Sequence, residues 1–243
     1  MILYAVGLGP GDADYMAPKA KEAILESDVI VGYTTYMKLI EEITKGKELV
    51  ATGMTGETQR CEAAIQEALK GKKVCVVSSG DAGIYGMASL LFELAAAHPS
   101  IEIEVIPGIT AAVSAAALLG SPLTNDFAVI SLSDHLTPWE LIEKRLDACS
   151  SADMVVSIYN PQSSQRSDYL QKACNISLKY KPPETKCGYV KNAYRGESAE
   201  IHICTLEELA ATDVDMFTTV IIGNSATMTI DGKLVTTRGY DVS

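Results

Sequence analysis

The feature of this sequence that most constrains its fold is an apolar strand that runs into a glycine-rich turn. Residues 74–78 are small or β-branched and do not alternate with polar residues, which is typical of a strand buried on both faces. Residues 79–86 then bring three glycines and Asp81, and an alanine- and leucine-rich stretch follows. In open α/β sheets, ligands bind at the carboxyl ends of the strands. The stretch therefore predicts either a ligand-binding turn or an ordinary strand–helix connection, since glycine is common in tight turns.

The same order of strand, turn and helix recurs through the first half of the chain. Pro18 is well placed as the first residue of one helix, and Gly71 is a stop signal after another helix over residues 57–69. Regular alternation of strands and helices predicts an α/β architecture with a mainly parallel sheet. The predicted strands of this half cover residues 2–6, 28–33, 48–51, 74–78 and 101–106.

The regular alternation of strands and helices pauses at residues 121–125, where we place a domain boundary or a long connection. The predicted domains are residues 1–121, an α/β domain with the glycine-rich loops, and residues 122–243, a second α/β domain. The second half joins some of its strands without an intervening helix, so its sheet is predicted to be mixed. Its last segment, residues 229–235, predicts a hairpin that turns at Asp231-Gly232.

Charge and hydropathy restrict the partners of the chain. A formal net charge of −11 over 243 residues argues against a broad phosphate-binding surface, so we expect no nucleic-acid partner. An acidic small substrate is compatible with this charge, because it needs only a local cluster of lysine and arginine. The chain enters its first strand without a basic leader, and no apolar run is long enough to cross a bilayer, so we expect no membrane partner.

The cysteines and histidines indicate neither disulfides nor a metal centre. The six cysteines form no C-x-x-C pair and several lie in apolar contexts, which favours reduced core thiols and a cytoplasmic protein. The three histidines are scattered without metal-ligand spacing, so we predict no metal site.

Three common catalytic or nucleotide-binding motifs do not match. Residues 7–11 (GLGPG) have the spacing G-x-G-x-G instead of G-x-G-x-x-G, and Pro10 removes a backbone donor from the turn. Neither glycine-rich turn has the Gly-Lys-Ser/Thr of a P-loop, and no G-x-S-x-G elbow is present. The turns are instead suited to holding a polar small molecule by backbone contact, for chemistry that depends on positioning two reactants.

Three motifs of the first half resemble signatures of the tetrapyrrole methylase family. They are residues 6–12 (VGLGPGD), 79–86 (SGDAGIYG) and 107–111 (PGITA), in the family's order. Residues 130–139 (ISLSDHLTPW) and 157–161 (SIYNP) resemble the branch of the family that methylates C17 of precorrin-3-type tetrapyrroles in cobalamin synthesis. The resemblance covers nearly the whole chain.

The resemblance implies two α/β domains, S-adenosylmethionine bound in an active-site cleft between them, a tetrapyrrole substrate and a homodimer. The reaction would be methylation at C17 with contraction of the ring. Because the sulfonium methyl group is already activated, the transfer needs alignment and exclusion of water and no metal from the protein. Matched by motif, the cofactor-lining residues would be Pro10, Gly80, Asp81, Ile84, Thr110, Ala111, Tyr159, Asn160 and Ala193.

Asp134 and His135 are the candidates for acid–base catalysis. They lie at a predicted strand end, before a helix with Thr137 as its expected N-cap and Pro138 as its first residue, so they should face the cleft. Histidine is a natural proton shuttle near neutral pH. The alternative is that Ser133 or Asp134 caps a turn and that His135 is merely solvated.

The carboxylates of a tetrapyrrole also call for cationic side chains near the site. Arg60, Arg166, Lys191 and Arg195 are candidates, because each lies in or beside a predicted strand-end loop. Each is equally compatible with a solvated surface charge.

Three hypotheses about function stay open at this level. The first is a C17-methyltransferase of corrin synthesis, and the second is a family member with another ring position or another substrate. The third is a non-catalytic nucleotide-binding α/β regulator. The sequence does not distinguish a metal-free from a cobalt-bearing substrate.

Overall fold

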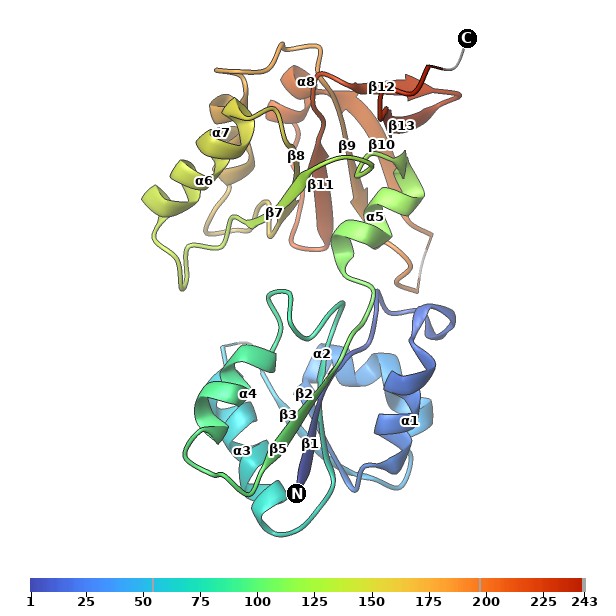
Figure 1. Cartoon of the computed structure of the whole chain (residues 1–243), viewed down its shortest axis with the longest axis vertical. Coiled ribbons are helices and arrows are strands. Elements are labelled where there is room, and N and C mark those ends of the chain that lie inside the picture. Colours follow the sequence, from blue (N-terminus) through green and yellow to red (C-terminus); the bar gives the residue numbers. More distant parts are fainter. Residues whose placement is uncertain (54, 197, 242–243) are drawn as a thin grey trace. The chain divides into compact units, whose positions relative to one another are not determined.

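The computed structural model describes residues 1–53, 55–196 and 198–241, which form two compact units (Figure 1). The first unit consists of Met1–Thr110 together with Tyr194–Gly196, and Ala111–Ala193 begins the second unit. Each unit contains a five-stranded sheet with helices packed on it. The prediction of two α/β domains, the first with a parallel sheet and the second with a mixed one, is confirmed.

All strands of the first sheet run parallel, in the order β3-β2-β4-β1-β5. The strands are β1 (Ile2–Gly7), β2 (Val29–Tyr33), β3 (Glu48–Thr52), β4 (Val74–Ser78) and β5 (Glu102–Ile106). Because the strands are parallel, the turns that follow them gather at one edge. Strands β4, β1 and β5 are neighbours, so the three family-like motifs, which follow these strands, come together at that edge.

Apolar side chains cover both faces of the first sheet, as its unalternating strands predict. Leu3 and Ala5 of β1 face a core shared with α3 (Glu57–Leu69) and α4 (Ala88–Ala95). Tyr4 and Val6 face the opposite core, which is shared with α1 (Pro18–Glu26) and the 3-10 helix η2 (Lys38–Thr44). Figure 1 shows α1 on one side of the sheet and α3 and α4 on the other. The remaining short helices of this unit are η1 (Ala13–Tyr15) and α2 (Thr34–Met37).

The sheet of the second unit is mixed, in the order β10-β9-β11-β8-β7. Only β7 and β8 pair in parallel within it, and the other neighbours are antiparallel. A small three-stranded sheet, β12-β13-β6, accompanies it. The strands are β6 (Gly120–Ser121), β7 (Phe127–Ser131), β8 (Val155–Tyr159), β9 (Lys186–Lys191), β10 (Glu200–Thr205), β11 (Thr218–Ile222), β12 (Thr227–Ile230) and β13 (Lys233–Thr236).

Helices cover both faces of this sheet too. One core includes residues of α6 (Trp139–Ser151), α7 (Tyr169–Ser177) and α8 (Leu206–Ala210). The other core includes α5 (Ala111–Leu119), which packs on β9 and β11. Since α5 is built of small apolar residues that fit closely on this sheet, the compact units divide after Thr110, earlier than the boundary predicted after residue 121. No helix within the described ranges has the length and apolar character needed to cross a membrane.

Local turn and cap predictions have mixed outcomes. The hairpin between β12 and β13 turns at Asp231-Gly232, and both residues have positive φ (49° and 71°), as a type I′ turn requires. The prediction that Thr137 caps α6 is wrong, because the helix begins at Trp139 after Pro138 and has no side-chain cap bond.

Candidate functional site

The turns after β1 and β4 are joined by backbone hydrogen bonds. Gly9 N donates to Gly80 O at 3.0 Å, and Gly80 N donates to Gly9 O at 2.7 Å. Both glycines have positive φ (75° and 69°), a conformation that glycine adopts without a steric penalty. The two motifs therefore form one continuous backbone surface at the carboxyl edge of the sheet.

The third motif approaches the same surface so closely that only glycine fits. A Cβ atom on Gly108 would lie 2.2 Å from Gly80 O and 2.7 Å from Gly7 C. The Asp81 carboxylate adds a polar link, since its Oδ2 accepts from Gly108 N at 2.9 Å and its Oδ1 accepts from Gly83 N at 2.8 Å. Asp81 thus holds the turn after β5 against the turn after β4.

The structure places the other predicted residues of the first unit around these turns. Pro10 is buried and continues the turn after β1. Ile84 is 40% exposed and belongs to the turn after β4, where it offers apolar surface. Thr110 is buried two residues beyond Gly108. Among the predicted cofactor-lining residues, those of the first unit are therefore brought to one edge of one sheet.

In the second unit, Tyr159 and Asn160 lie at the end of β8. The Tyr159 hydroxyl accepts a hydrogen bond from Ala112 N at 2.7 Å, at the first turn of α5, which begins at Ala111. Asn160 has a positive φ of 50°, and its Nδ2 donates to Ser131 Oγ at 2.9 Å. Ala193 is partly buried and packs against the core that includes α5.

Asp134 belongs to a charged cluster beside β7 and β8. Its Oδ2 accepts from the Tyr169 hydroxyl at 2.6 Å, and its Oδ1 lies 3.4 Å from Arg166 Nη1, which also donates to Ser133 Oγ at 2.8 Å. The Tyr169 hydrogen bond and then Arg166 hold the pKa of Asp134 below its ordinary value, so the carboxylate is ionised at neutral pH. His135 is exposed. The catalytic roles of Asp134 and His135 stay predictions.

The four candidate cations have different environments. Arg60 is buried and structural: it donates to Thr52 Oγ1 at 2.9 Å and to Gly53 O at 3.0 Å. Lys191 forms ion pairs with Asp215 at 3.1 Å and Glu200 at 3.8 Å.

The environments of Arg195 and Arg166 differ from those of Arg60 and Lys191. Arg195 binds the glycine-rich turns of the first unit, with its Nε 3.2 Å from Pro10 O. The side chain of Arg166 is 16% exposed, and its Nε is buried with no hydrogen-bond partner among the described residues. A buried donor without an acceptor is costly, and this feature distinguishes Arg166 from Arg60, Lys191 and Arg195.

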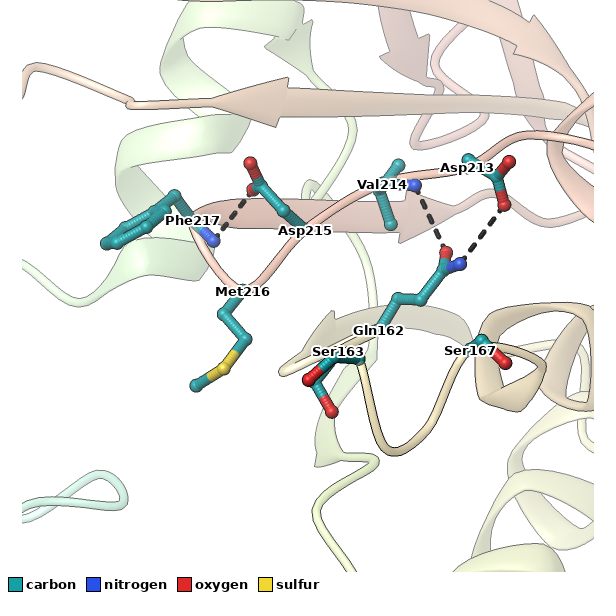
Figure 2. Close-up of a pocket in the computed structure, with 9 residues that line it drawn as sticks. Gln162, Ser163, Ser167, Asp213, Val214, Asp215, Met216 and Phe217 are labelled. Carbon is teal, nitrogen blue, oxygen red and sulfur yellow. Dashed lines mark hydrogen bonds between the residues drawn. The ribbon is translucent and has the colours of Figure 1, made fainter. Parts of the chain in front are cut away.

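A hollow of about 540 Å³ opens between the loop after β8 and the loop before β11 (Figure 2). Gln162 spans it, donating to Asp213 Oδ1 at 3.1 Å and accepting from Val214 N at 3.1 Å. Met216 and Phe217, which are 42% and 54% exposed, give it an apolar part. Because β11 begins at the end of the sheet where β8 finishes, the hollow shares that end with Tyr159 and Asn160.

The cysteines take no part in these arrangements. All six are unbridged. Burial raises the pKa of Cys61 and Cys204 to about 11 and that of Cys187 to about 12, so these thiols are protonated and poor nucleophiles at neutral pH. Within the described ranges, no group of three or more His, Cys, Asp or Glu residues could hold a metal ion.

Sequence reasoning missed several residues that shape these sites. Tyr169 binds Asp134, and Tyr194 and Ser79 contact the elements that carry the glycine-rich turns. Ser79 lies within a quoted motif and could have been singled out. The others are separated from their partners by turns whose geometry the sequence does not specify.

The fold and the turns define a class of protein: a two-unit α/β protein whose glycine-rich turns gather at the carboxyl edge of a parallel sheet. The chain belongs to the tetrapyrrole methylase family, since the family described as Tetrapyrrole (Corrin/Porphyrin) Methylases matches residues 2–210. The family resemblance predicted from the sequence is confirmed.

Individual relatives agree with this assignment. The chain is 46% identical over 243 residues to the cobalt-factor III methyltransferase of Priestia megaterium, covering 98% of this chain and 45% of that protein. It is 44% identical to the probable cobalt-factor III C(17)-methyltransferase of Salmonella typhimurium, covering 98% of this chain and 99% of that protein. The chain thus spans less than half of the first relative and almost all of the second.

A solved structure extends the similarity to three dimensions. The crystal structure of the methyltransferase CobJ matches with a TM-score of 0.89 and 35% identity, over 97% of this chain and 99% of that one. A cobalt precorrin-4 methyltransferase, at 22% identity and a TM-score of 0.74, shares the fold.

Proposed function

We propose that this protein transfers a methyl group from S-adenosylmethionine to C17 of a precorrin-3-type tetrapyrrole, with ring contraction, in cobalamin synthesis. The observation that carries the proposal is the 44% identity, over nearly the full length of both chains, to a relative named as a C(17)-methyltransferase. Four of the relatives are named for cobalt-factor III, which favours a cobalt-bearing substrate over a metal-free one.

The cofactor contacts that we propose are the nine residues predicted from the family motifs. The close packing of the turns at Gly9, Gly80 and Gly108 supports this assignment, because it brings the three family motifs together at the carboxyl edge of the sheet. In the proposed step, the nucleophilic C17 attacks the sulfonium methyl carbon and the bond to sulfur breaks, releasing S-adenosylhomocysteine. The protein's contribution is to align carbon, methyl and sulfur and to exclude water.

We further propose that Arg166 binds a carboxylate of the tetrapyrrole. Its guanidinium is oriented by Ser133 and Asp134 through Nη1, and Nε is left without an acceptor. Arginine forks bind carboxylates through two parallel hydrogen bonds, which gives orientation as well as affinity. Met216 and Phe217 in the neighbouring hollow would contact apolar parts of the macrocycle.

The role of Arg166 is tested by replacing it with glutamine. The R166Q variant should bind the tetrapyrrole about tenfold more weakly in a titration followed by the substrate's visible absorbance, which corresponds to about 1.4 kcal/mol. Its affinity for S-adenosylhomocysteine should not change. Equal tetrapyrrole affinity in the variant and the wild type would contradict the proposal.

A single-turnover assay under anaerobic conditions tests the reaction itself. The protein is mixed with methyl-labelled S-adenosylmethionine and either cobalt-factor III or metal-free precorrin-3B. Label at C17 of the cobalt form supports the proposal, whereas label at another ring position makes the chain a different member of the family. Cofactor binding without label in either macrocycle contradicts the C17 assignment.

We also propose that the protein is a cytoplasmic homodimer that binds neither nucleic acid nor membranes. The net charge of −11 and the unbridged cysteines support this proposal. Light scattering of the purified protein should give twice the 25.9 kDa mass of one chain. A mass of one chain at micromolar concentration would contradict the dimer.

A further inference from the structure

Three residues far along the chain, Tyr194–Gly196, belong to the first compact unit. Arg195 is their main anchor. Its Nε donates to Pro10 O at 3.2 Å, its Nη2 donates to Ser79 Oγ, and its guanidinium carbon lies 5.9 Å from the centre of the Tyr36 ring. One side chain thus connects the turn after β1 to the turn after β4, beside the mutual backbone bonds of Gly9 and Gly80.

Tyr194 fixes the same segment independently. Its carbonyl accepts from Asp12 N at 2.9 Å, and its ring packs against that of Tyr15 with centroids 4.1 Å apart and ring planes tilted by 33°. Tyr194 has a positive φ of 51°, which is a genuine outlier for a bulky residue. Such backbone strain persists only where surrounding contacts determine it, and it concentrates at functional sites.

The contacts of Arg195 also argue against a role in binding a substrate carboxylate. It was a candidate for binding a substrate carboxylate, but two of its three guanidinium nitrogens already donate to Pro10 and Ser79. Its aliphatic stem is packed as well: a Cβ atom on Gly11 would lie 3.3 Å from Arg195 Cγ. Arginine can hold two acceptors at a fixed spacing because its donors form a rigid fork, which lysine lacks.

We propose that Arg195 is a positioning residue for the cofactor, which sets the separation of the two glycine-rich turns that bind the nucleoside sulfonium. The inference rests on the proposed function, since it assumes that these turns hold S-adenosylmethionine. Arg195 acts through Pro10 and Ser79 and does not touch the reacting atoms. Its loss therefore weakens the cofactor site while the tetrapyrrole contacts of the second unit are unaffected.

Arg60 provides a closely matched control within the same unit. It also donates to one hydroxyl (Thr52) and one carbonyl (Gly53), and its guanidinium carbon also lies 5.9 Å from a tyrosine ring centre, that of Tyr33. It differs in joining α3 to the end of the edge strand β3 and, through Nη1, to Met87 Sδ at 3.6 Å. An effect of R195Q that is absent from R60Q is therefore specific to the contacts of Arg195 with Pro10 and Ser79.

The test measures the dissociation constant of S-adenosylhomocysteine by calorimetry, well below the melting temperature of each variant. R195Q should bind at least tenfold more weakly and R195K should be intermediate, while R60Q should lower the melting temperature and keep wild-type affinity. Tetrapyrrole affinity should be the same in all four proteins. R195K keeps a donor at the site, and its cofactor affinity provides the test if R195Q does not fold.

Two results would overturn the inference while the proposed function stands. One is wild-type cofactor affinity in R195Q or R195K. The other is a loss of tetrapyrrole affinity in these variants instead of a loss of cofactor affinity, which would make Arg195 a substrate contact. Failure of the wild-type protein itself to bind S-adenosylhomocysteine would refute the proposed function, and the inference with it.

Discussion

At the scale of single residues, Asp81 shows how a small side chain can organise a backbone site. Each of its carboxylate oxygens accepts from a different amide, Gly83 N in its own turn and Gly108 N in the turn after β5. Hydrogen bonds from amides to a carboxylate are stronger than those to neutral acceptors. Asp81 therefore ties the turn after β4 to the turn after β5.

Replacing Asp81 with asparagine tests this role. Asparagine keeps one acceptor oxygen, so one of the two amides loses its partner, and we expect a loss of about 1–2 kcal/mol in the free energy of unfolding. Cofactor affinity should fall more than tenfold, because the turn after β5 is released. Urea unfolding and calorimetry with S-adenosylhomocysteine measure the two effects.

Asp28 offers the control for this substitution. It also accepts from a backbone amide, Lys73 N at 2.9 Å, but it precedes β2 at the opposite edge of the same sheet. The D28N variant should lose stability without losing cofactor affinity. Equal affinity losses in D28N and D81N would mean that Asp81 acts only through general stability.

Sequence reasoning identified the glycine-rich turns at residue level but not their partners. Asp81 was recognised because a carboxylate after a strand end is conspicuous. That it binds Gly108, 27 positions away, depends on β1 lying between β4 and β5, and strand order is not written in local sequence. Arg195 is the extreme case, since its partner Pro10 is 185 positions away.

At the scale of elements, strand and helix positions followed from sequence wherever a pattern was long. Two threonines that precede helices differ in whether they cap them. Thr205 forms a full capping box with Glu208 at the start of α8, whereas Thr137, which was predicted to cap α6, makes no cap bond. In the second case Pro138 takes the N-cap position, so the threonine lies one residue too early to reach the helix amides.

Asp153 joins three elements of the second unit at the start of β8. It accepts from Ser225 N and Oγ and pairs with Lys181 Nζ at 3.2 Å, and the Lys181 side chain is only 2% exposed. Burial raises the pKa of Asp153, but the hydrogen bonds from Ser225 and Lys181 outweigh it, so the pKa lies below its ordinary value. The carboxylate therefore stabilises the folded state most when it is ionised.

The lowered pKa of Asp153 makes the free energy of unfolding depend on pH. A folded-state pKa below the unfolded value of about 3.9 gives stability that is fully present above that pH and is lost as the pH falls through the folded-state pKa. The D153N variant leaves a buried ammonium unpaired. Because the Asp153 side chain is 46% exposed, we expect a loss of about 2 kcal/mol at pH 7, below the range for fully buried pairs.

Urea unfolding of the wild type and D153N at pH 7 and near pH 3 measures this contribution. The difference in unfolding free energy between the two proteins should shrink at the lower pH, where Asp153 begins to be protonated. D168N is the matched control, because it breaks an exposed pair with Lys172 and should change nothing measurable. A difference that is the same at both pH values would contradict the assignment.

At the scale of the whole molecule, ligand binding should appear as a gain in stability. A ligand at one hundred times its Kd stabilises the folded state by about 2.7 kcal/mol, which for a chain of this size raises Tm by roughly 5–10 °C. We expect S-adenosylhomocysteine to produce this shift and ATP or NAD to produce none. A shift with ATP or NAD alone would instead favour the nucleotide-binding regulator.

Membership of Tyr194–Gly196 in the first unit has a consequence for how this protein can be divided or rearranged. The first unit does not correspond to one uninterrupted stretch of gene, so a fragment that ends at Thr110 would lack Arg195 and its contacts with Pro10 and Ser79. Exchanging residues 1–110 alone between family members would pair the glycine-rich turns of one protein with the Arg195 segment of another.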